Sequence, residues 1–355
     1  AFTTKLAIYA LARGFAGAEI LVPVGIAMTL FPIFYAVIEN DLRKVLAYSL
    51  NNQLGYMVVG VGIGTQLALN GAAGHAFAHI IYKGLLFMSM GAVLYRTGTI
   101  KASELGGLYK SMPLTAVFCI IGSLSIAGFP LFSGFVTKSM TLSAAFSTHQ
   151  IWMFVGLLIA SAGVVDHSGI KIPFFAFFAH DSGRRVKEAP MNMLFAMGLA
   201  AFICIFLGVY PQPLYDLLPF PVRADAAGAA WHNFTASHVL TSLQLLLFAA
   251  LAFAVLYRKG LYPPEIRSTN LDFDWLYRRL LPRFIGHVRA GLGGLESRLS
   301  SLRRQTQDSL LGNIYRLHNP GGVLGGAWPP GTSALAIAIL LGLVLLFAYL
   351  FPALR

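Results

Sequence analysis

The stretch Ala72-Ala-Gly-His75-Ala-Phe-Ala-His79-Ile-Ile-Tyr-Lys83-Gly-Leu-Leu-Phe-Met-Ser-Met-Gly-Ala-Val-Leu-Tyr95 decides the fold of this chain. It exceeds the roughly 20 apolar residues that a membrane-spanning helix needs. Two histidines and a lysine interrupt it at four-residue steps. Because an α-helix has about 3.6 residues per turn, these three side chains stack on one face. Ionisable groups inside an apolar helix are costly to place in a bilayer, so their presence indicates a function.

The composition of the whole chain is that of a membrane protein. Of its 355 residues, 57% are hydrophobic and 11% are charged, whereas soluble domains carry about 25% charged residues. Soluble fold classes are therefore excluded. The net charge of +12 would suggest nucleic acid as a partner of a soluble protein, but no nucleic-acid-binding module is recognisable. Lys and Arg gather in the loops of membrane proteins, mainly on the cytoplasmic side, so we expect no nucleic acid among the partners.

Apolar runs separated by breakers predict an all-α fold, a polytopic transmembrane bundle of about ten helices. Prolines and glycines inside or between the runs predict that some of these helices are broken. We expect the first helix to be short for a full span. The predicted helices cover Thr3–Ala16, Ile20–Ile38, Val45–Gly64, Ala72–Tyr95, Leu114–Ala127, Leu131–Phe146, Ile151–Phe178, Met191–Val209, Val239–Tyr257 and Ser333–Phe351.

The segment Trp275–His318 differs from the rest because it is rich in Arg and Leu. Its apolar residues recur at three- and four-residue steps with arginines between them, which predicts an amphipathic helix that lies along a membrane surface. Gly291, Gly293 and Gly294 are expected to bend or break it. The alternative is a solvated basic linker, against which the helical period of the apolar residues argues.

The basic loops predict the topology incompletely. The loop Arg184–Lys187 and the amphipathic segment are both expected to be cytoplasmic, and the two helices between them agree with that. If every helix spans, the loops that hold Arg43 and Lys101 fall on the opposite side. A re-entrant helix at Leu131–Phe146 would change the parity, so the sequence leaves this point open.

The stripe of His75, His79 and Lys83 is the first candidate site, and three other groups of intramembrane charges follow it. An imidazole can donate a proton at one nitrogen while it accepts one at the other, so the stripe predicts a proton wire. The alternative is a pair of satisfied core histidines with a snorkelling lysine. A metal site at the two histidines is disfavoured because no carboxylate or cysteine accompanies them.

Lys138 follows the breaker Gly128-Phe-Pro-Leu-Phe-Ser-Gly134. A broken helix exposes backbone carbonyls inside the membrane, and these are tolerated only where protein or water meets them. Such carbonyls and water are expected to hold Lys138, unless it is a lysine at a helix boundary. By spacing alone, Lys5 is an anchoring lysine near a helix end.

Asp166, His167 and Lys171 form the last group. His167 and Lys171 share a face at a spacing of four residues, whereas Asp166 lies about 100° away from His167 on an α-helix. This group is either an additional relay or the interfacial end of a span. The chain contains no phosphate loop, dinucleotide fingerprint or nucleophile elbow. Its two cysteines lie apart in apolar runs, so we expect no cofactor, no metal and no enzymatic activity of the chain by itself.

The segment Asp41-Leu-Arg-Lys-Val-Leu-Ala-Tyr-Ser-Leu-Asn-Asn-Gln-Leu-Gly-Tyr56 resembles the antiporter-like subunits of respiratory complex I, membrane hydrogenases and Mrp-type cation/proton antiporters. His75–Phe87 and Gly128–Lys138 continue the resemblance, which covers residues 3 to 145. The stretch from His167 to Gly183 is most similar to the D-type subunits of Mrp antiporters.

The resemblance implies two inverted repeats, each with a broken helix. It matches Lys5 with the central lysine of the first half-channel, and His79 and Lys83 with the connecting residues at the membrane midplane. Lys138 matches the terminal charged residue that is linked to one aqueous side. The family's first helices, with the glutamate that pairs with the lysine matched by Lys5, have no counterpart in this sequence. We therefore expect a fragment, or a chain whose N-terminal half is a separate polypeptide.

Three parts follow from this comparison. Residues 1–211 are expected to form the C-terminal part of the antiporter-like core, and residues 212–257 a loop with an additional transmembrane helix. Residues 258–355 resemble the lateral helix and anchor of the largest complex I antiporter-like subunits. The compact D-type subunits lack such a tail.

The expected function is proton conduction in a multisubunit Na⁺/H⁺ antiporter of the bacterial inner membrane, through Lys5, His75, His79, Lys83 and Lys138. The expected partners are other integral membrane subunits of an antiporter or respiratory complex, the lipid bilayer, H⁺ and Na⁺. The alternatives are a proton-pumping subunit of NADH–quinone oxidoreductase or a membrane hydrogenase, and a structural subunit whose polar residues only pack. No cluster of intramembrane carboxylates indicates a Na⁺ site, so sodium is expected to bind elsewhere in the complex.

Overall fold

A computed structural model describes residues 2–222, 231–266, 270, 274–291, 293–319, 321–322, 325 and 329–350, without the side chains of 293–299 and 348. The chain divides into two compact units, one up to Asn270 and one from Leu271 onward. The described residues contain helices and no strand, which confirms the all-α prediction. The three-part division at residues 211 and 257 stays a prediction.

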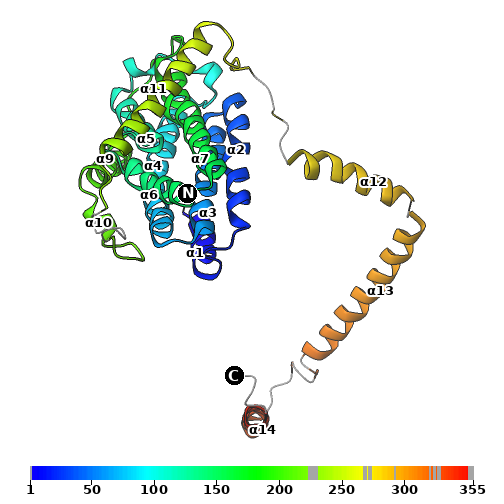
Figure 1. Cartoon of the computed structure of the whole chain (residues 1–355). Helices are drawn as coiled ribbons and strands as arrows, with labels where there is room; N and C mark the ends of the chain where they lie inside the picture. Colours follow the sequence, from blue (N-terminus) through cyan, green and yellow to red (C-terminus); the bar gives the residue numbers. More distant parts are fainter. Residues whose placement is uncertain are drawn as a thin grey trace. The chain divides into compact units, whose positions relative to one another are not determined.

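The first unit is a bundle in which helices pack side by side (Figure 1). The long helix α7 continues through two π-helical turns, η3 (Val165–Ile170) and η4 (Phe174–Phe178), that flank α8 (Lys171–Pro173). The other elements are α1 (Thr4–Gly14), α2 (Leu21–Ile38), α3 (Leu42–Ile63), α4 (Gln66–Thr97), the short 3₁₀ turns η1 (Ala102–Glu104) and η2 (Leu108–Lys110), α5 (Pro113–Ala127), α6 (Ser133–Ser147), α7 (Ile151–Val164), α9 (Met191–Val209), α10 (Gln212–Tyr215) and α11 (Ala236–Arg258).

The second unit contains the π-helical turn η5 (Leu276–Leu280), α12 (Leu281–Gly291), α13 (Gly293–His318) and α14 (Pro330–Leu350). The helical structure predicted for Trp275–His318 is therefore confirmed where the chain is described. The position of this segment on a membrane surface stays a prediction. The predicted end of the last helix, Phe351, lies outside the described residues.

Six helices of the described chain are long and apolar enough to cross a membrane. They are α2, α4, the continuous helix Ile151–Phe178, α9, α11 and the part of α14 up to Phe347. Of the other helices, α1, α5 and α6 are shorter, as expected for the first helix and for a span that is broken, whereas α3 and α13 are long enough but less apolar. This pattern confirms a polytopic membrane bundle with interrupted helices.

The break between α5 and α6 divides one span into two halves. Gly128 ends α5 with a φ of +82°, a conformation that suits glycine because it has no Cβ. The start of α6 then packs so closely on the end of α5 that a Cβ at Gly134 would clash with the carbonyl oxygen of Ser125. Because both halves contain 15 residues, each is about 22 Å long and neither alone spans the bilayer.

The basic loops lie at the same end of the first unit. The loop after α2 pairs with the loop after α4 through the bridge between Asp41 and Lys101. Arg96 at the end of α4 donates to the carbonyl oxygen of Glu188, at 2.9 Å from Nε and 2.6 Å from Nη2. Since α7 with its continuation is a full span, α5 and α6 together make one crossing. That answers the open question of parity: the basic loops share one side, which is called the basic end below.

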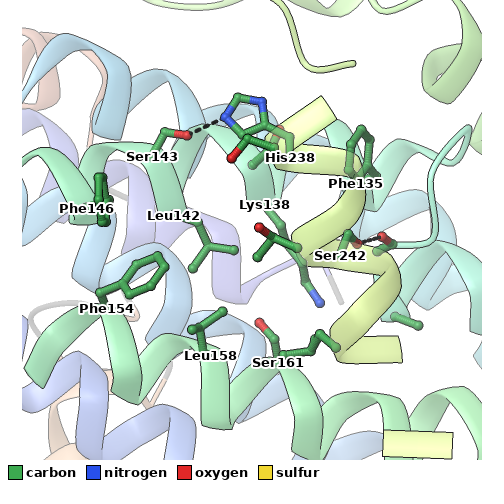
Figure 2. A pocket seen from close by; sticks show the side chains of 16 residues that line it. Phe135, Lys138, Leu142, Ser143, Phe146, Phe154, Leu158, Ser161, His238 and Ser242 are labelled. Carbon is green, nitrogen blue, oxygen red and sulfur yellow. Dashed lines mark hydrogen bonds between the residues drawn. The ribbon is translucent and has the colours of Figure 1, made fainter. Parts of the chain in front are cut away.

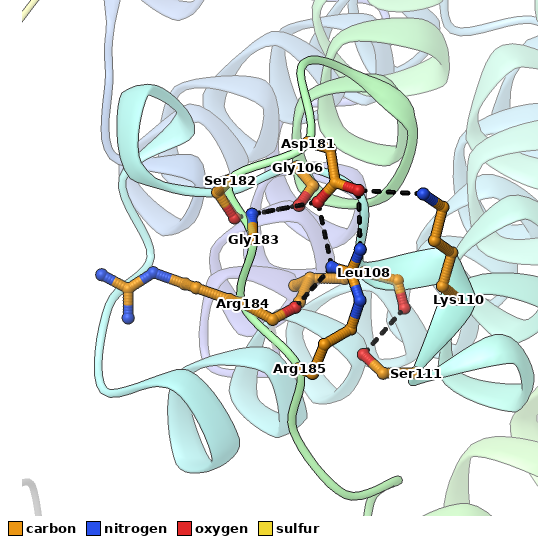
Figure 3. A network of polar contacts seen from close by, with 9 residues as sticks. All are labelled: Gly106, Leu108, Lys110, Ser111, Asp181, Ser182, Gly183, Arg184 and Arg185. Atoms are coloured by element: carbon orange, nitrogen blue, oxygen red, sulfur yellow. Dashed lines mark hydrogen bonds and ion pairs between the residues drawn. The ribbon is translucent and has the colours of Figure 1, made fainter.

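Asp181 joins two of these loops (Figure 3). Lys110 Nζ lies 2.9 Å from Asp181 Oδ2, and Arg185 binds both carboxylate oxygens, at 2.9 and 2.6 Å. The backbone N–H of Gly183 also donates to Asp181 Oδ1, at 3.0 Å. These bonds, above all those from Arg185, hold the pKa of Asp181 below its usual range.

We expect Asp181→Asn to loosen the loop 179–190 because it removes the charge that Arg185 and Lys110 bind. Limited proteolysis of the membrane-embedded protein should cut this loop several-fold faster, with little loss of folded protein, since exposed ion pairs stabilise weakly. A depressed pKa means that the wild-type contacts persist above the ordinary pKa and fail only as the pH falls through the depressed value. Wild-type protection should therefore be constant from about pH 5 to pH 8. Asp216→Asn, another exposed carboxylate, is the control. Equal cutting of all three proteins would contradict the role of Asp181.

Candidate functional site

The two histidines and the lysine of α4 are fully buried inside the first unit. His75, His79 and Lys83 each have 0% exposure, and α4 packs against α3, α5, α6 and α9. His75 bridges two of these helices, because its Nδ1 lies 3.0 Å from Thr137 Oγ1 of α6 and its Nε2 lies 3.0 Å from Gln53 Oε1 of α3. Both ring nitrogens are thus engaged, which suits a group that can accept at one nitrogen and donate at the other.

Lys5 reaches the stripe from α1. Its Nζ lies 2.7 Å from Nδ1 of His79, although the two residues are 74 positions apart in the chain. The ring centres of His79 and His75 are 6.2 Å apart. The structure therefore brings Lys5, His79 and His75 into one row that crosses the bundle. The spacing of residues in the sequence could not show this position of Lys5.

Polar side chains of α3 and α4 extend this row. Tyr82 OH donates to Gln53 Oε1 at 3.2 Å, and Gln53 Nε2 donates to Asn52 Oδ1 at 2.7 Å. Asn52 Nδ2 in turn donates to the carbonyl oxygen of Thr29 in α2, at 2.5 Å. Sequence reasoning missed Gln53 and Tyr82 as site residues. The signal was three adjacent amides, Asn51, Asn52 and Gln53, inside a long predicted membrane helix.

Lys83 and His79 both keep a polar atom without a protein partner. Lys83 Nζ and His79 Nε2 are buried and have no hydrogen-bond partner among the residues that the structure describes. Buried polar groups are normally bonded to protein or to ordered water. These two atoms are therefore able to bind a further polar group.

Lys138 lies at the break between α5 and α6, as the sequence predicted. It is 4% exposed, and its Nζ donates to the carbonyl oxygen of Ile126 at 2.6 Å. This carbonyl belongs to the last turn of α5, where helical carbonyls lack intrahelical partners. Thr137, the residue before Lys138, holds His75, so the lysine is one residue away from the row of α4.

A cavity of about 280 Å³ opens beside Lys138, between α6, α7 and α11 (Figure 2). Its wall mixes phenylalanines and leucines with hydroxyl groups. Ser242 Oγ of α11 donates to the carbonyl oxygen of Gly128 at 2.7 Å, and Ser143 Oγ lies 3.0 Å from His238 Nε2. Ser161 Oγ is buried in the wall without a hydrogen-bond partner among the described residues. Because α6 ends and α7 and α11 begin here, the cavity belongs to the end of the unit opposite the basic end.

Asp166, His167 and Lys171 are divided between two sets of contacts. His167 Nδ1 lies 2.8 Å from Ser168 Oγ, which donates to Ser49 Oγ at 2.7 Å. The backbone N–H of Lys171 bonds to the carbonyl oxygen of Asp166, five residues back, because this turn is π-helical. The extra residue in the turn shifts the register, and Asp166 becomes a counter-charge of Lys171.

Lys171 is fully buried and binds the end of α2. Its Nζ lies 2.6 Å from the carbonyl oxygen of Val37, 2.8 Å from that of Glu39 and 2.9 Å from Glu265 Oε1. Glu265, in the loop after α11, was not among the predicted site residues, and no signal in the sequence pointed to it. Burial raises the pKa of Glu265, and the charge of Lys171 opposes this shift. Among the described residues, no group of three or more His, Cys, Asp or Glu could hold a metal ion.

Known proteins are similar to this chain in sequence. NADH-ubiquinone oxidoreductase chain 5 of Dictyostelium citrinum is 31% identical over 267 residues, which are 72% of this chain and 39% of the relative. The D-type component of the Na⁺/H⁺ antiporter of Alkalihalophilus pseudofirmus is 33% identical over 226 residues, which are 60% of this chain and 45% of the relative. The chain thus spans less than half the length of these two relatives.

Among solved structures, the Mrp complex of a Dietzia species has a chain that matches with a TM-score of 0.55 and 22% identity, over 73% of this chain and 53% of that one. At this identity the likeness shows the fold. Residues 1–163 also match the family described as NADH:quinone oxidoreductase/Mrp antiporter, transmembrane. The chain is therefore a multi-pass membrane protein that is similar, over its N-terminal part above all, to antiporter-like subunits of the Mrp and complex I type.

Proposed function

We propose that this chain transfers protons within a larger membrane complex, along a row formed by Lys5, His79, His75 and Lys138, with Lys83 beside it. The observation that carries the proposal is that two histidines and two lysines are buried side by side in one bundle, and that the half-buried Lys5 reaches the first of the histidines. Lys5 lies 2.7 Å from His79, and His75 binds Thr137, the neighbour of Lys138. If these side chains only packed in the core, nothing would explain why three lysines lie around two histidines.

The step between the two histidines uses water. Their ring centres are 6.2 Å apart, which is too far for a direct hydrogen bond. Because both nitrogens of His75 are already engaged, a water at Nε2 of His79, which has no partner among the described residues, reaches His75 through the hydroxyl of Tyr82. Tyr82 lies beside both rings, with its OH 3.3 Å from His75 Nε2. A proton that reaches His79 from Lys5 therefore passes through water and the hydroxyl of Tyr82 to His75, and then by the hydroxyl of Thr137 toward Lys138.

Repulsion between the charges of the three lysines favours each proton-transfer step. Lys5, Lys83 and Lys138 carry like charges inside a medium of low dielectric constant, where they repel one another strongly. A proton that arrives on one lysine therefore favours release from the next. The cavity beside Lys138 gives this end of the row an aqueous outlet, because its hydroxyl-lined wall can hold water.

The basic loops give the orientation. Because Lys and Arg gather on the cytoplasmic side, the basic end of the first unit faces the cytoplasm and the cavity faces the opposite side. We infer a bacterial inner membrane as the location. We also infer that other integral membrane subunits surround the chain and supply the half-channel that pairs with Lys5.

Cation/proton antiport is the first candidate for the whole complex, since the relative with 33% identity belongs to a Na⁺/H⁺ antiporter. Redox-driven proton pumping is the second candidate. The observation that favours it is the longer match, over 72% of this chain, with an NADH-ubiquinone oxidoreductase chain. Proton transfer along the same row serves both.

Mass spectrometry of the purified native complex separates the two candidates. We expect only small hydrophobic membrane subunits beside this chain if the complex is an antiporter. Subunits that carry flavin or iron–sulfur clusters would instead establish the redox-driven pump.

We expect Lys138→Gln to reduce proton flux by about tenfold or more. The amide of glutamine can still donate a hydrogen bond to the carbonyl oxygen of Ile126, but it does not release or accept a proton. The flux is measured with a pH-sensitive dye in vesicles that contain the reconstituted complex. Lys187→Gln, the same change in an exposed loop, is the control. If Lys138→Gln only lowers the yield of complex and each remaining complex conducts normally, the lysine is structural and the proposal fails.

We expect Thr137→Val to lower proton flux several-fold, since valine has the same shape and lacks the hydroxyl that joins His75 to α6. The matched control is Thr141→Val, one turn later on the same helix. Thr141 is as fully buried, and its hydroxyl donates only to the carbonyl oxygen of Thr137, at 3.4 Å. Equal effects of the two substitutions would argue against the step through Thr137.

A further inference from the structure

The row from Lys5 to Lys138 has an outlet at one end only. Its cavity lies away from the basic loops. At the basic end, Lys171 and Glu265 form a buried ion pair at 2.9 Å, with side-chain exposures of 0% and 7%. Such a pair costs desolvation energy, and an apolar pair of similar volume would often be at least as stable. Stability alone therefore does not account for it.

The surroundings of Lys171 hold more carboxylates than one ammonium needs. Glu39, Asp166 and Glu265 all attract it. Three backbone carbonyls at the end of α2, those of Ala36, Val37 and Glu39, also accept from its ammonium. Glu39 is itself fixed by the backbone N–H of Asp41 and by Asn270 Nδ2, at 3.0 and 3.2 Å. The cluster thus contains several sites between which a proton can move.

This cluster is joined to the interior by the π-helical turn. Asp166, Lys171 and His167 lie on it, and π-helical turns occur frequently at functional sites. His167 is fully buried, and its Nε2 has no hydrogen-bond partner among the described residues. Lys83 and Lys171 both act electrostatically on His167. The imidazole is therefore on the same turn as the cluster and within electrostatic reach of Lys83 in α4.

We propose that Glu265 and Lys171 are the proton entrance at the basic end, which passes protons by Asp166 and His167 to Lys83. The inference rests on the proposed function and extends it to the second side of the membrane. In the first step the O–H bond of protonated Glu265 breaks and an N–H bond forms on the neutral amine of Lys171. The pair becomes carboxylate and ammonium, and Lys171 then releases the proton inward.

The loop of Glu265 is suited to this role. Tyr262 packs against Phe253 and Phe175, with ring centres 4.9 and 6.3 Å away, and is 6% exposed. The loop is therefore held against the helices rather than free. The groups that face the pair are Glu39 from the end of α2, Asp166 and His167 from the π-helical turn, and Tyr262 from the same loop. Burial raises the pKa of Glu265, which brings its protonation closer to physiological pH.

The decisive variant is Lys171→Arg. Arginine keeps the positive charge, the ion pair with Glu265 and the donors for the end of α2, but it does not lose its proton in proteins. If Lys171 only caps α2, the variant conducts normally. If Lys171 relays protons, flux in vesicles falls by about tenfold or more. Lys110→Arg, in the exposed ion pair with Asp181 at the same end, is the matched control and should conduct as the wild type does.

Glu265→Gln tests the first step separately. We expect a several-fold lower flux and a flatter dependence of the flux on pH at the basic side, with partial recovery in Glu265→Asp. A structural role would lower the yield of complex and leave the pH profile per complex unchanged, which would overturn the inference.

The double variant Lys171→Met with Glu265→Leu covers the case in which a single variant does not assemble. It replaces the pair by apolar side chains, which buried ion pairs commonly tolerate. Normal flux in the assembled double variant would overturn the inference. The row from Lys5 to Lys138 is tested separately by Lys138→Gln. If that variant loses flux and Lys171→Arg does not, only the proposed entrance is wrong. If both retain full flux, the proposed function fails as well.

Discussion

The bond between Lys138 and the carbonyl oxygen of Ile126 is the interaction on which the rest of the structure depends. An ammonium inside a bilayer needs oxygen partners, and a continuous α-helix has no free carbonyls in its middle. The break after Gly128 provides them, since it ends α5 at the depth where α6 begins. The same break opens the cavity at the start of α11. One interruption therefore places a charge, its ligand and its access to water together.

That break also determines the topology. Because α5 and α6 make one crossing together, the loops after α2 and α4 and the loop around Asp181 meet at the same end. Their lysines and arginines then obey the positive-inside rule with no exception among these loops. If α5 and α6 were two full spans, Lys110 and Asp181 would lie on opposite sides, and their ion pair could not form.

Local patterns in the sequence predicted much of this, and the tertiary contacts explain what they could not predict. The stripe of His75, His79 and Lys83 follows from the helical period, and the break before Lys138 follows from Gly128 and Pro130. The contact of Lys5 with His79 needs the packing of α1 on α3 and α4, which spacing does not encode. The π-helical turn that moves Asp166 toward Lys171 has no sequence signature either. Glu265 lies in a loop, where no periodicity marks a buried carboxylate.

Lys138 and Lys171 are both buried, and the charge of each is compensated in a different way. Lys138 binds a helix carbonyl and faces a cavity, so water can compensate its charge when it is protonated. Lys171 binds the carbonyls at the end of α2, where the helix dipole is negative, and has Glu265 as a fixed counter-charge. In the proposed pathway, Lys138 exchanges protons with water in the cavity, whereas Lys171 exchanges them with the groups that hold it. This difference is why replacing Lys171 by an equally charged arginine separates proton transfer from packing at that end, whereas at Lys138 the neutral glutamine is the sharper probe.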